Sequence, residues 1–498
     1  MATRRAIIRA ALAAPIAGLM NQEQVFAQPN LLHDVSGSDW HNSPDGRSFE
    51  EYKICFSKGL KHGFEGYPDP KAYTNFCTAI QARDLNALER MKASVPWVDP
   101  IAGDKISSAD VLGLLGGKWW GTKVMVGDVA ELYWASLCRD IPFSDYDRNE
   151  LVHRAQDELR RIDNARFSSL PFKINIPGMT DGGYLSQFLI KPVPINGAGL
   201  SQRIYCPTGS NDFLTTIESW AECQNGVRTR SITTHLDVPR YVFNGRALSE
   251  FVRNDFVFQA FLWAALILQS WGRRAINPSL ATHYIEGSTS FVNNGWAEVF
   301  ALLAEASHRA LRDAWFWKWR VFRRLRPEEF AGRYALAVNE AFATDEARKL
   351  DALEAMSASK AKFGTALLSQ AYPEGSPLHP AFPAGHAEIA GACVTILKAF
   401  TDPAALIPFP VTPSLDGLDV VSFEKDLSIE GELNKLAWNI AFGRSFAGIH
   451  YRSDHEAGLL LGEDVALRLL AERAREIVRA KSTVWFRRFD GTWTSVSV

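Results

Sequence analysis

Three stretches in the C-terminal half of the chain combine basic side chains, imidazoles and glycines at spacings that suit the binding of an oxyanion. The first runs from Trp315 to Glu328 and contains Lys318 and Arg326 at the end of a predicted helix, which Pro327 terminates. A lysine brings a point charge and an arginine a planar fork of donors, and both match the oxygens of an oxyanion. Alone, this stretch is better explained as a solvated basic helix end, which the helix dipole favours.

The second stretch, 379–388, joins an extended proline-containing segment to a helix that we expect to begin near Ala384 or Gly385. Backbone N–H groups in the first turn of a helix have no partner inside that helix, so they form a ready site for an anion. Gly385 lets a ligand approach the backbone closely, and His386 lies where its ring reaches the same ligand. Alone, a histidine at this position fits a local cap or a hydrogen-bonded core residue equally well.

The third stretch, 443–456, places Arg444 and His450 on either side of a glycine-containing turn between two predicted helices. A turn of this kind can direct both side chains into one pocket. The alternative is ordinary decoration of a helix end, with Arg452 and Glu456 as a surface ion pair. Together, the three stretches supply three cations, free backbone N–H groups and two imidazoles. That set suits a multiply charged oxyanion of tetrahedral or trigonal-bipyramidal shape, such as phosphate or vanadate.

The order of these motifs resembles the superfamily that joins vanadium-dependent haloperoxidases and type 2 phosphatidic acid phosphatases. Finer details resemble the algal-type bromoperoxidase branch. Lys318 and Arg326 stand eight residues apart, His379 stands seven before His386, and Trp315 stands three before the lysine. Shorter similarities begin at 56–60 and recur up to 254–259, so the resemblance covers most of the chain.

The resemblance implies vanadate as cofactor, bound to the protein through His450, with Lys318, Arg326, Arg444 and the Gly385 N–H around its oxygens. It further implies that His386 is the general acid and base, that Lys318 polarises the peroxide, and that His379 lies in the same pocket. The implied reaction uses hydrogen peroxide to oxidise a halide to a hypohalous acid equivalent, which then halogenates small organic molecules. Because the chlorinating relatives tend to carry an aromatic residue where this chain has His379, we expect bromide and iodide as substrates and chloride as a poor one.

One position departs from the family pattern, which usually has serine where this chain has Ala384. The missing hydroxyl would otherwise bond a vanadate oxygen, so vanadate affinity and halide preference become open questions. Behind the pocket, we expect Asp255 to pair with Arg444, and Asp454 either to assist His450 or only to begin the final helix. Trp315 is the third supporting residue that we expect.

The rival enzyme hypothesis is an acid phosphatase of the same superfamily, in which His450 attacks phosphorus and His386 protonates the leaving group. The eight-residue spacing, His379 and the extent of the resemblance argue against it. A helical scaffold without catalytic activity is a further alternative.

The elements that must position these residues are predicted to be mostly α-helices. We expect a mostly α fold of helix bundles, two of them resembling four-helix bundles, with a few short strands and a C-terminal β-hairpin turning at Asp490-Gly491. The predicted helices are 69–92, 128–139, 145–165, 247–272, 295–326, 357–371, 384–401, 431–447 and 453–480. We divide the chain into a leader (1–27), an N-terminal helical region with long loops (28–245) and a C-terminal bundle region with the vanadate site (246–498).

Composition limits the remaining classes. Lys and Arg number 54 against 56 Asp and Glu, a net charge of −2, which excludes a globally basic nucleic-acid binder. The six cysteines stand singly, which argues against a thiolate metal site, while Cys206 and Cys223 could pair in an exported protein. The longest apolar run after the leader, 256–268, is too short to span a membrane.

The first residues predict export. Arg4 and Arg5 precede an alanine-rich stretch and resemble a twin-arginine signal, with 25–27 as a plausible cleavage site. We therefore expect a periplasmic or extracellular protein, or a cytoplasmic one if the leader is not functional. Relatives form dimers and larger assemblies, so we also expect a homodimer or a larger homo-oligomer.

Overall fold

The computed structural model describes residues 54–63, 66–89, 96–107, 119–168, 170–227, 229, 231–280, 290–336, 349–476 and 482–498. The leader, 1–27, lies outside these residues. Residues Asn42–Val498 form one compact unit, and the division after residue 245 stays a prediction.

The described part of the chain is mostly helical, which confirms the predicted fold class. Among the described residues before 245, the helices are α3 (Pro70–Ala82), α4 (Leu85–Glu89), α6 (Lys123–Cys138), α7 (Glu150–Asp163) and α8 (Ile217–Gln224). Those after it are α9 (Gly245–Asn254), α10 (Gln259–Ser270), α11 (Trp296–Phe316), α12 (Pro327–Leu336), α14 (Glu354–Phe363), α15 (Gly385–Phe400), α16 (Ile429–Phe446) and α17 (Arg452–Glu476).

The strands of the described residues form three short antiparallel hairpins. They are β1 (Val193–Ile195) with β2 (Ala198–Leu200), β3 (Val411–Pro413) with β4 (Val420–Ser422), and β5 (Thr483–Arg487) with β6 (Trp493–Ser497). The last pair is the predicted C-terminal hairpin, with Asp490-Gly491 in its connection and Gly491 at φ +83°. Cys206 and Cys223 are both free and buried.

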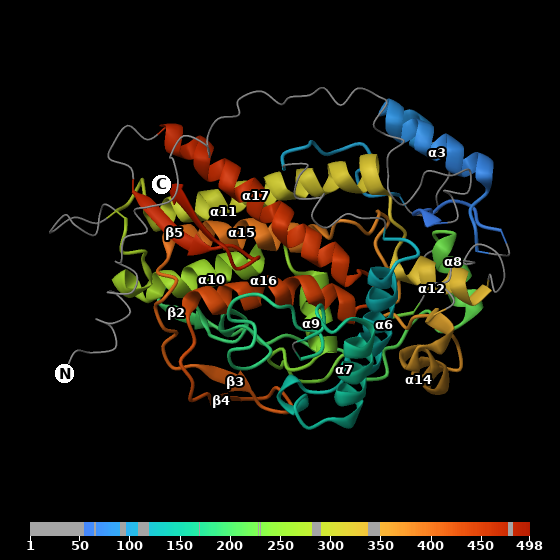
Figure 1. The fold of residues 1–498 in the computed structure, drawn as a ribbon, viewed down its shortest axis with the longest axis horizontal. Helices are drawn as coiled ribbons and strands as arrows, with labels where there is room; N and C mark the ends of the chain where they lie inside the picture. The colour runs from blue at the N-terminus through green and yellow to red at the C-terminus, as the bar shows by residue number, and fades with distance from the viewer. Residues whose placement is uncertain are drawn as a thin grey trace. The chain divides into compact units, whose positions relative to one another are not determined.

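A bundle of α10, α11, α15, α16 and α17 forms the centre of this unit, with α15 in contact with each of the other four (Figure 1). The contact between α15 and α17 depends on glycine. A Cβ atom at Gly462 would lie 1.9 Å from the backbone oxygen of Glu388, and one at Gly391 would lie 2.2 Å from that of Leu459. The two backbones therefore touch, and the start of α15 is held beside the start of α17.

Two predicted helices differ from the structure in ways that concern the site. The predicted helix 247–272 is broken into α9 and α10, which meet at 97°, because Asp255 leaves helical geometry with ψ 145°. The predicted helix 295–326 becomes a π-helix at Trp317–Phe322 and ends when Arg323 adopts a left-handed φ of 44°. Within the described part of the chain, no single helix passes the length and apolarity criteria for a membrane span, and α9 and α10 meet them only when the two bent halves are taken together.

Smaller differences have local causes. The helix predicted at 357–371 is α14, which stops where Gly364 takes a left-handed φ of 72°. The helix predicted at 69–92 ends at Ala82 because Arg83 is left-handed, and α4 follows as a separate short helix.

Candidate functional site

The three motif-bearing stretches, far apart in the sequence, meet at one buried point. Arg326 of the first stretch donates through Nη1 to His450 Nε2 of the third, at 2.8 Å. The same guanidinium lies 3.0 Å from His379 Nδ1 of the second stretch, through Nη2. Lys318 Nζ donates to the backbone oxygens of residues 380 and 381, at 2.7 and 2.9 Å. Hydrogen bonds therefore join all three stretches directly.

Lys318 reaches this point because it lies on the π-helical turn Trp317–Phe322, and single π turns are frequent at functional sites. Its side chain is fully buried. Burial lowers the pKa of the Lys318 ammonium well below its ordinary value, and the nearby Arg326 guanidinium lowers it further. The carboxylates of Asp454 and Glu388 act in the opposite direction without restoring the ordinary pKa, so among the described residues the lysine is short of negative charge.

The two arginines of the cluster, Arg326 and Arg444, are short of negative charge in the same way as Lys318. Burial, and next the charge of Arg444, lowers the pKa of Arg326 to about 9. Arg444 donates through Nη1 to the backbone oxygen of Val252 at 2.8 Å, and its buried Nε has no hydrogen-bond partner among the described residues. Within the described ranges, no carboxylate lies at ion-pair distance from Lys318, Arg326 or Arg444. An oxyanion is the ligand that would satisfy this donor set.

The N-terminus of α15 adds backbone donors to the cluster. The helix begins at Gly385, and its N-cap residue, Ala384, provides no side-chain cap. Ala384 is fully buried, and its own N–H donates to the backbone oxygen of Asp454 at 3.0 Å. The first N–H groups of α15 are thus held against the start of α17, where an anion can bind them.

His450 is held by a carboxylate on one side and faces the cations on the other. Its Nδ1 lies 2.9 Å from Asp454 Oδ2, which also accepts the Tyr451 N–H at 3.0 Å. Arg324 donates to the other oxygen of Asp454 at 3.1 Å. We assign Nδ1–H to the bond with the carboxylate, which leaves the lone pair on Nε2 for Arg326 or for a metal. Burial, and next the charge of Arg326, keeps the pKa of His450 well below its ordinary value.

Asp255 is placed differently from our prediction. Its Oδ1 lies 3.1 Å from His386 Nε2, whereas Arg444 bonds a backbone oxygen of α9 one turn earlier. The predicted Asp255–Arg444 pair is therefore wrong. The reason is the break between α9 and α10, which turns the carboxylate away from the helix axis and toward the start of α15. His386 retains a side-chain exposure of 28 %, so the cluster meets solvent at this ring.

Trp315 and His379 line another side of the cluster. Their ring centroids are 4.8 Å apart, and Lys318 Nζ lies 5.9 Å from the centroid of the Trp315 ring. Burial, followed by the charge of Arg326, lowers the pKa of His379 well below its ordinary value. A neutral imidazole and an indole thus lie beside the lysine.

Sequence reasoning missed three residues around His450. Arg324 bonds Asp454, His455 bonds Ser445 at 2.8 Å, and Ser445 donates to the backbone oxygen of His450, also at 2.8 Å. Arg324 is one of several arginines in its stretch, and no spacing separates it from its neighbours. Ser445 and His455 stand at positions that the motif leaves unspecified.

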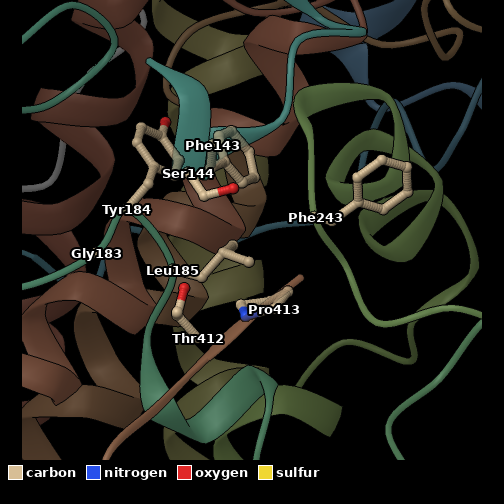
Figure 2. Close-up of a pocket in the computed structure, with 8 residues that line it drawn as sticks. All are labelled: Phe143, Ser144, Gly183, Tyr184, Leu185, Phe243, Thr412 and Pro413. Atoms are coloured by element: carbon tan, nitrogen blue, oxygen red, sulfur yellow. The ribbon is translucent and has the colours of Figure 1, made fainter. Parts of the chain in front are cut away.

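A separate small cavity is unrelated to this cluster (Figure 2). Its volume is about 30 Å³, room for a water molecule or two and too little for an organic substrate. None of the predicted site residues lines it. Its lining residues are Phe143, Ser144, Gly183, Tyr184, Leu185, Phe243, Thr412 and Pro413.

Comparisons with known proteins agree with the fold and the cluster. Residues 298–479 match the family model described as the VCPO second helical-bundle domain. The chain is 30% identical over 480 residues to a vanadium-dependent bromoperoxidase of Ascophyllum nodosum, covering 88% of this chain and 85% of that one. It is 31% identical over 540 residues to one of Corallina pilulifera, covering 87% and 90%.

A solved structure supports the same relationship. The second vanadate-dependent bromoperoxidase of Ascophyllum nodosum, described as homohexameric, superposes with a TM-score of 0.81 and 26% sequence identity. The match covers 89% of this chain and 84% of that one.

Proposed function

The chain belongs to the vanadium-dependent bromoperoxidase family, and we propose from that premise that it uses hydrogen peroxide to oxidise bromide and iodide. The product is a hypohalous acid equivalent that halogenates small organic molecules. One observation carries the proposal: three buried cations, with no carboxylate at ion-pair distance among the described residues, surround a histidine whose Nε2 lone pair faces them.

The residues present fit vanadate. Lys318, Arg326, Arg444 and the Gly385 N–H would hold its oxygens, and His450 would bind the metal. Bound vanadate supplies Lewis-acid activation of the peroxide. The resemblance implies a serine where this chain has Ala384, so we expect this chain to hold the oxyanion with one side-chain donor fewer.

The protein's own groups set where protons are held. Asp255 accepts from His386 Nε2–H, so Nδ1 is the nitrogen that takes up and returns protons at the solvent-facing edge of the cluster. An ammonium carries three N–H groups, and Lys318 donates two of them to backbone carbonyls. The third N–H group remains to polarise the peroxide. Asp454 holds His450 in the tautomer that leaves Nε2 free.

Halide preference follows from the rings beside the lysine. His379 puts a polar imidazole in the pocket, 4.8 Å from the Trp315 ring. We expect bromide and iodide to be oxidised well and chloride poorly. The test is the chloride-to-bromide rate ratio of His379→Phe against wild type. Efficient chlorination by the wild-type enzyme, unchanged in the variant, would refute this assignment.

The decisive experiment combines vanadium analysis with a bromide and peroxide assay, before and after vanadate is removed and restored. We expect activity to vanish with the vanadate, to return with it, and to be inhibited by inorganic phosphate, which matches the cluster in shape and charge. Full bromide oxidation by vanadate-free protein would refute the proposal. The phosphatase alternative is not favoured by the comparisons, and hydrolysis of a generic phosphate ester without vanadate is its test.

We also propose export and self-association. The arginine pair at 4–5 supports secretion through a twin-arginine route, and N-terminal sequencing of the exported protein tests it. The homohexameric structure of the A. nodosum relative supports a homodimer or a larger homo-oligomer, which light scattering measures.

A further inference from the structure

Ser445 joins three parts of the site that come from different elements. It follows Arg444 directly on α16, and its Oγ–H donates to the backbone oxygen of His450 at 2.8 Å. His455 of α17 lies on its other side, with Nε2 2.8 Å from the same Oγ. The three residues form one chain of hydrogen bonds, and all are buried.

The direction of this chain follows from proton counting. A carbonyl oxygen only accepts, so Ser445 must donate its one hydroxyl proton to the backbone oxygen of His450. His455 must then donate from Nε2–H to the serine oxygen. Its Nδ1 is buried and has no hydrogen-bond partner within the described ranges. His455 therefore bonds Ser445 through Nε2 alone, and only the tautomer that carries its proton on Nε2 can donate this hydrogen bond.

The ring of His455 also supports His450 by contact. The two imidazole centroids are 5.6 Å apart, and the rings of Trp438 and Phe442 pack against His455 at 6.0 and 6.1 Å. An aromatic wall thus fixes the donor in place. Asp454 fixes the imidazole of His450 from one side, while the Ser445–His455 pair fixes its backbone from another.

We propose that His455 is a positioning residue that holds His450, through Ser445, at the distance from Arg444 that vanadate requires; this inference rests on the proposed function. Retention of vanadate needs the Nε2 lone pair of His450 in one place. Retention of phosphate needs only the charges and N–H groups of the cluster. The hydrogen-bond chain therefore matters for the preference between the two anions more than for anion binding itself.

The test is titration of the full-length, vanadate-free protein with vanadate and, separately, with phosphate, followed by protein fluorescence. His455→Phe keeps the ring and removes the donor, and Ser445→Ala removes the link. We expect vanadate affinity to fall about tenfold in each, with phosphate affinity within about twofold of wild type. His455→Gln, which keeps an N–H donor, should recover most of the vanadate preference. The double variant should be no worse than either single one, because both break the same chain.

Ser136→Ala is the matched control, since Ser136 is a buried serine with a single hydroxyl bond to a backbone carbonyl, far from the cluster in sequence. It should leave the vanadate-to-phosphate preference unchanged. Equal loss of both anions in His455→Phe and Ser445→Ala, or a lower thermal midpoint with an unchanged preference, would overturn the positioning role. If His455→Phe does not fold, Ser445→Ala decides alone. A wild-type protein that oxidises no bromide and has no preference for vanadate would refute the proposed function instead, and this inference with it.

Discussion

Two fully buried arginines, close in space to the same histidine, have opposite surroundings. Arg452, two residues after His450, binds Glu131 through two bonds of 2.8 and 2.5 Å. It also forms the predicted ion pair with Glu456, at 3.6 Å, but its guanidinium is buried rather than at the surface. Burial lowers the pKa of Arg452, but Glu131 outweighs it and the net shift is upward. Within the part of the chain that the structure describes, the Arg326 guanidinium bonds only neutral groups, and burial, with Arg444 next, lowers its pKa to about 9.

The difference distinguishes a buried charge that stabilises the fold from one that binds a ligand. The charge of a buried arginine is balanced on folding when a carboxylate of the chain pairs with it. The charge of a group of buried cations bonded to carbonyls and imidazoles is balanced only when an anion binds. Burial alone does not distinguish the two cases, because both arginines are buried. The hydrogen-bond partners of each arginine do distinguish them, and they indicate that the Arg326 cluster, rather than the Arg452 pair, is the binding site.

Replacement of His450 and of His386 should have the largest effects on the cluster, and the two effects should differ. Loss of His450 in His450→Ala removes the vanadium ligand, so the protein should no longer retain vanadate after gel filtration. His386→Ala should keep much of the vanadate but slow peroxide turnover on the order of 10²-fold or more, because it removes the proton-transfer group. Vanadium content and bromide oxidation measure the two effects. Equal vanadium retention in both variants would contradict the roles assigned here.

Removal of each arginine tests the comparison through stability. Arg452→Met should destabilise the vanadate-free protein by about 3–5 kcal/mol, because it leaves the buried Glu131 without its partner. Arg326→Met should cost far less in the absence of anions, because it relieves repulsion with Lys318 and Arg444. Denaturant unfolding in phosphate-free buffer measures both. Similar losses in the two variants would mean that the cluster is not short of negative charge.

The motif residues could be predicted because each depends on a local helix end. Pro327 and Gly385 mark where α12 and α15 begin, and the turn before α17 carries His450. The partners of these residues could not be predicted in the same way. Asp255 meets His386 only because α9 and α10 meet at 97°, an angle that helical periodicity does not encode.

The other features that the sequence could not predict depend on packing between distant segments. The α15–α17 contact depends on close approach at Gly391 and Gly462, and glycines inside a helical pattern indicate no particular neighbour. The sequence likewise predicts ordinary helix where the π-helical turn directs Lys318 inward.

Added anions should stabilise the protein, because they supply the negative charge that the Arg326 cluster needs and the Arg452 pair does not. Vanadate or phosphate at one hundred times its Kd should stabilise the protein by about 2.7 kcal/mol if it binds only the folded state. The anion should also raise the depressed pKa of Lys318, so the bound form takes up a proton and affinity should fall as the pH rises. Thermal midpoints at several anion concentrations and two pH values measure both. Sodium chloride at equal ionic strength is the control, and an equal shift with it would refute specific binding.

The smallest expected effect concerns Ala384, where the structure offers two uses for a new hydroxyl. In Ala384→Ser, a hydroxyl directed at the oxyanion adds one hydrogen bond to a charged acceptor, about 1.5–3 kcal/mol. Vanadate affinity would then rise roughly tenfold or more, since each 1.4 kcal/mol is a factor of ten. Titration of vanadate-free wild type and variant at one pH, without phosphate, measures it.

The second use is as a helix cap, because Ala384 is the N-cap residue of α15 and gives it no side-chain bond. A serine that turns back to cap the helix would stabilise the anion-free protein by about 0.5–2 kcal/mol and compete with the oxyanion for the same N–H groups. The two outcomes differ in sign: tighter vanadate binding with little change in the anion-free midpoint favours the oxyanion contact, and weaker binding with a higher midpoint favours the cap. We expect the first, because the cations of Lys318, Arg326 and Arg444 draw the oxyanion to this helix end. Turnover need not follow affinity, since equal stabilisation of the resting and transition states leaves the chemical step unchanged.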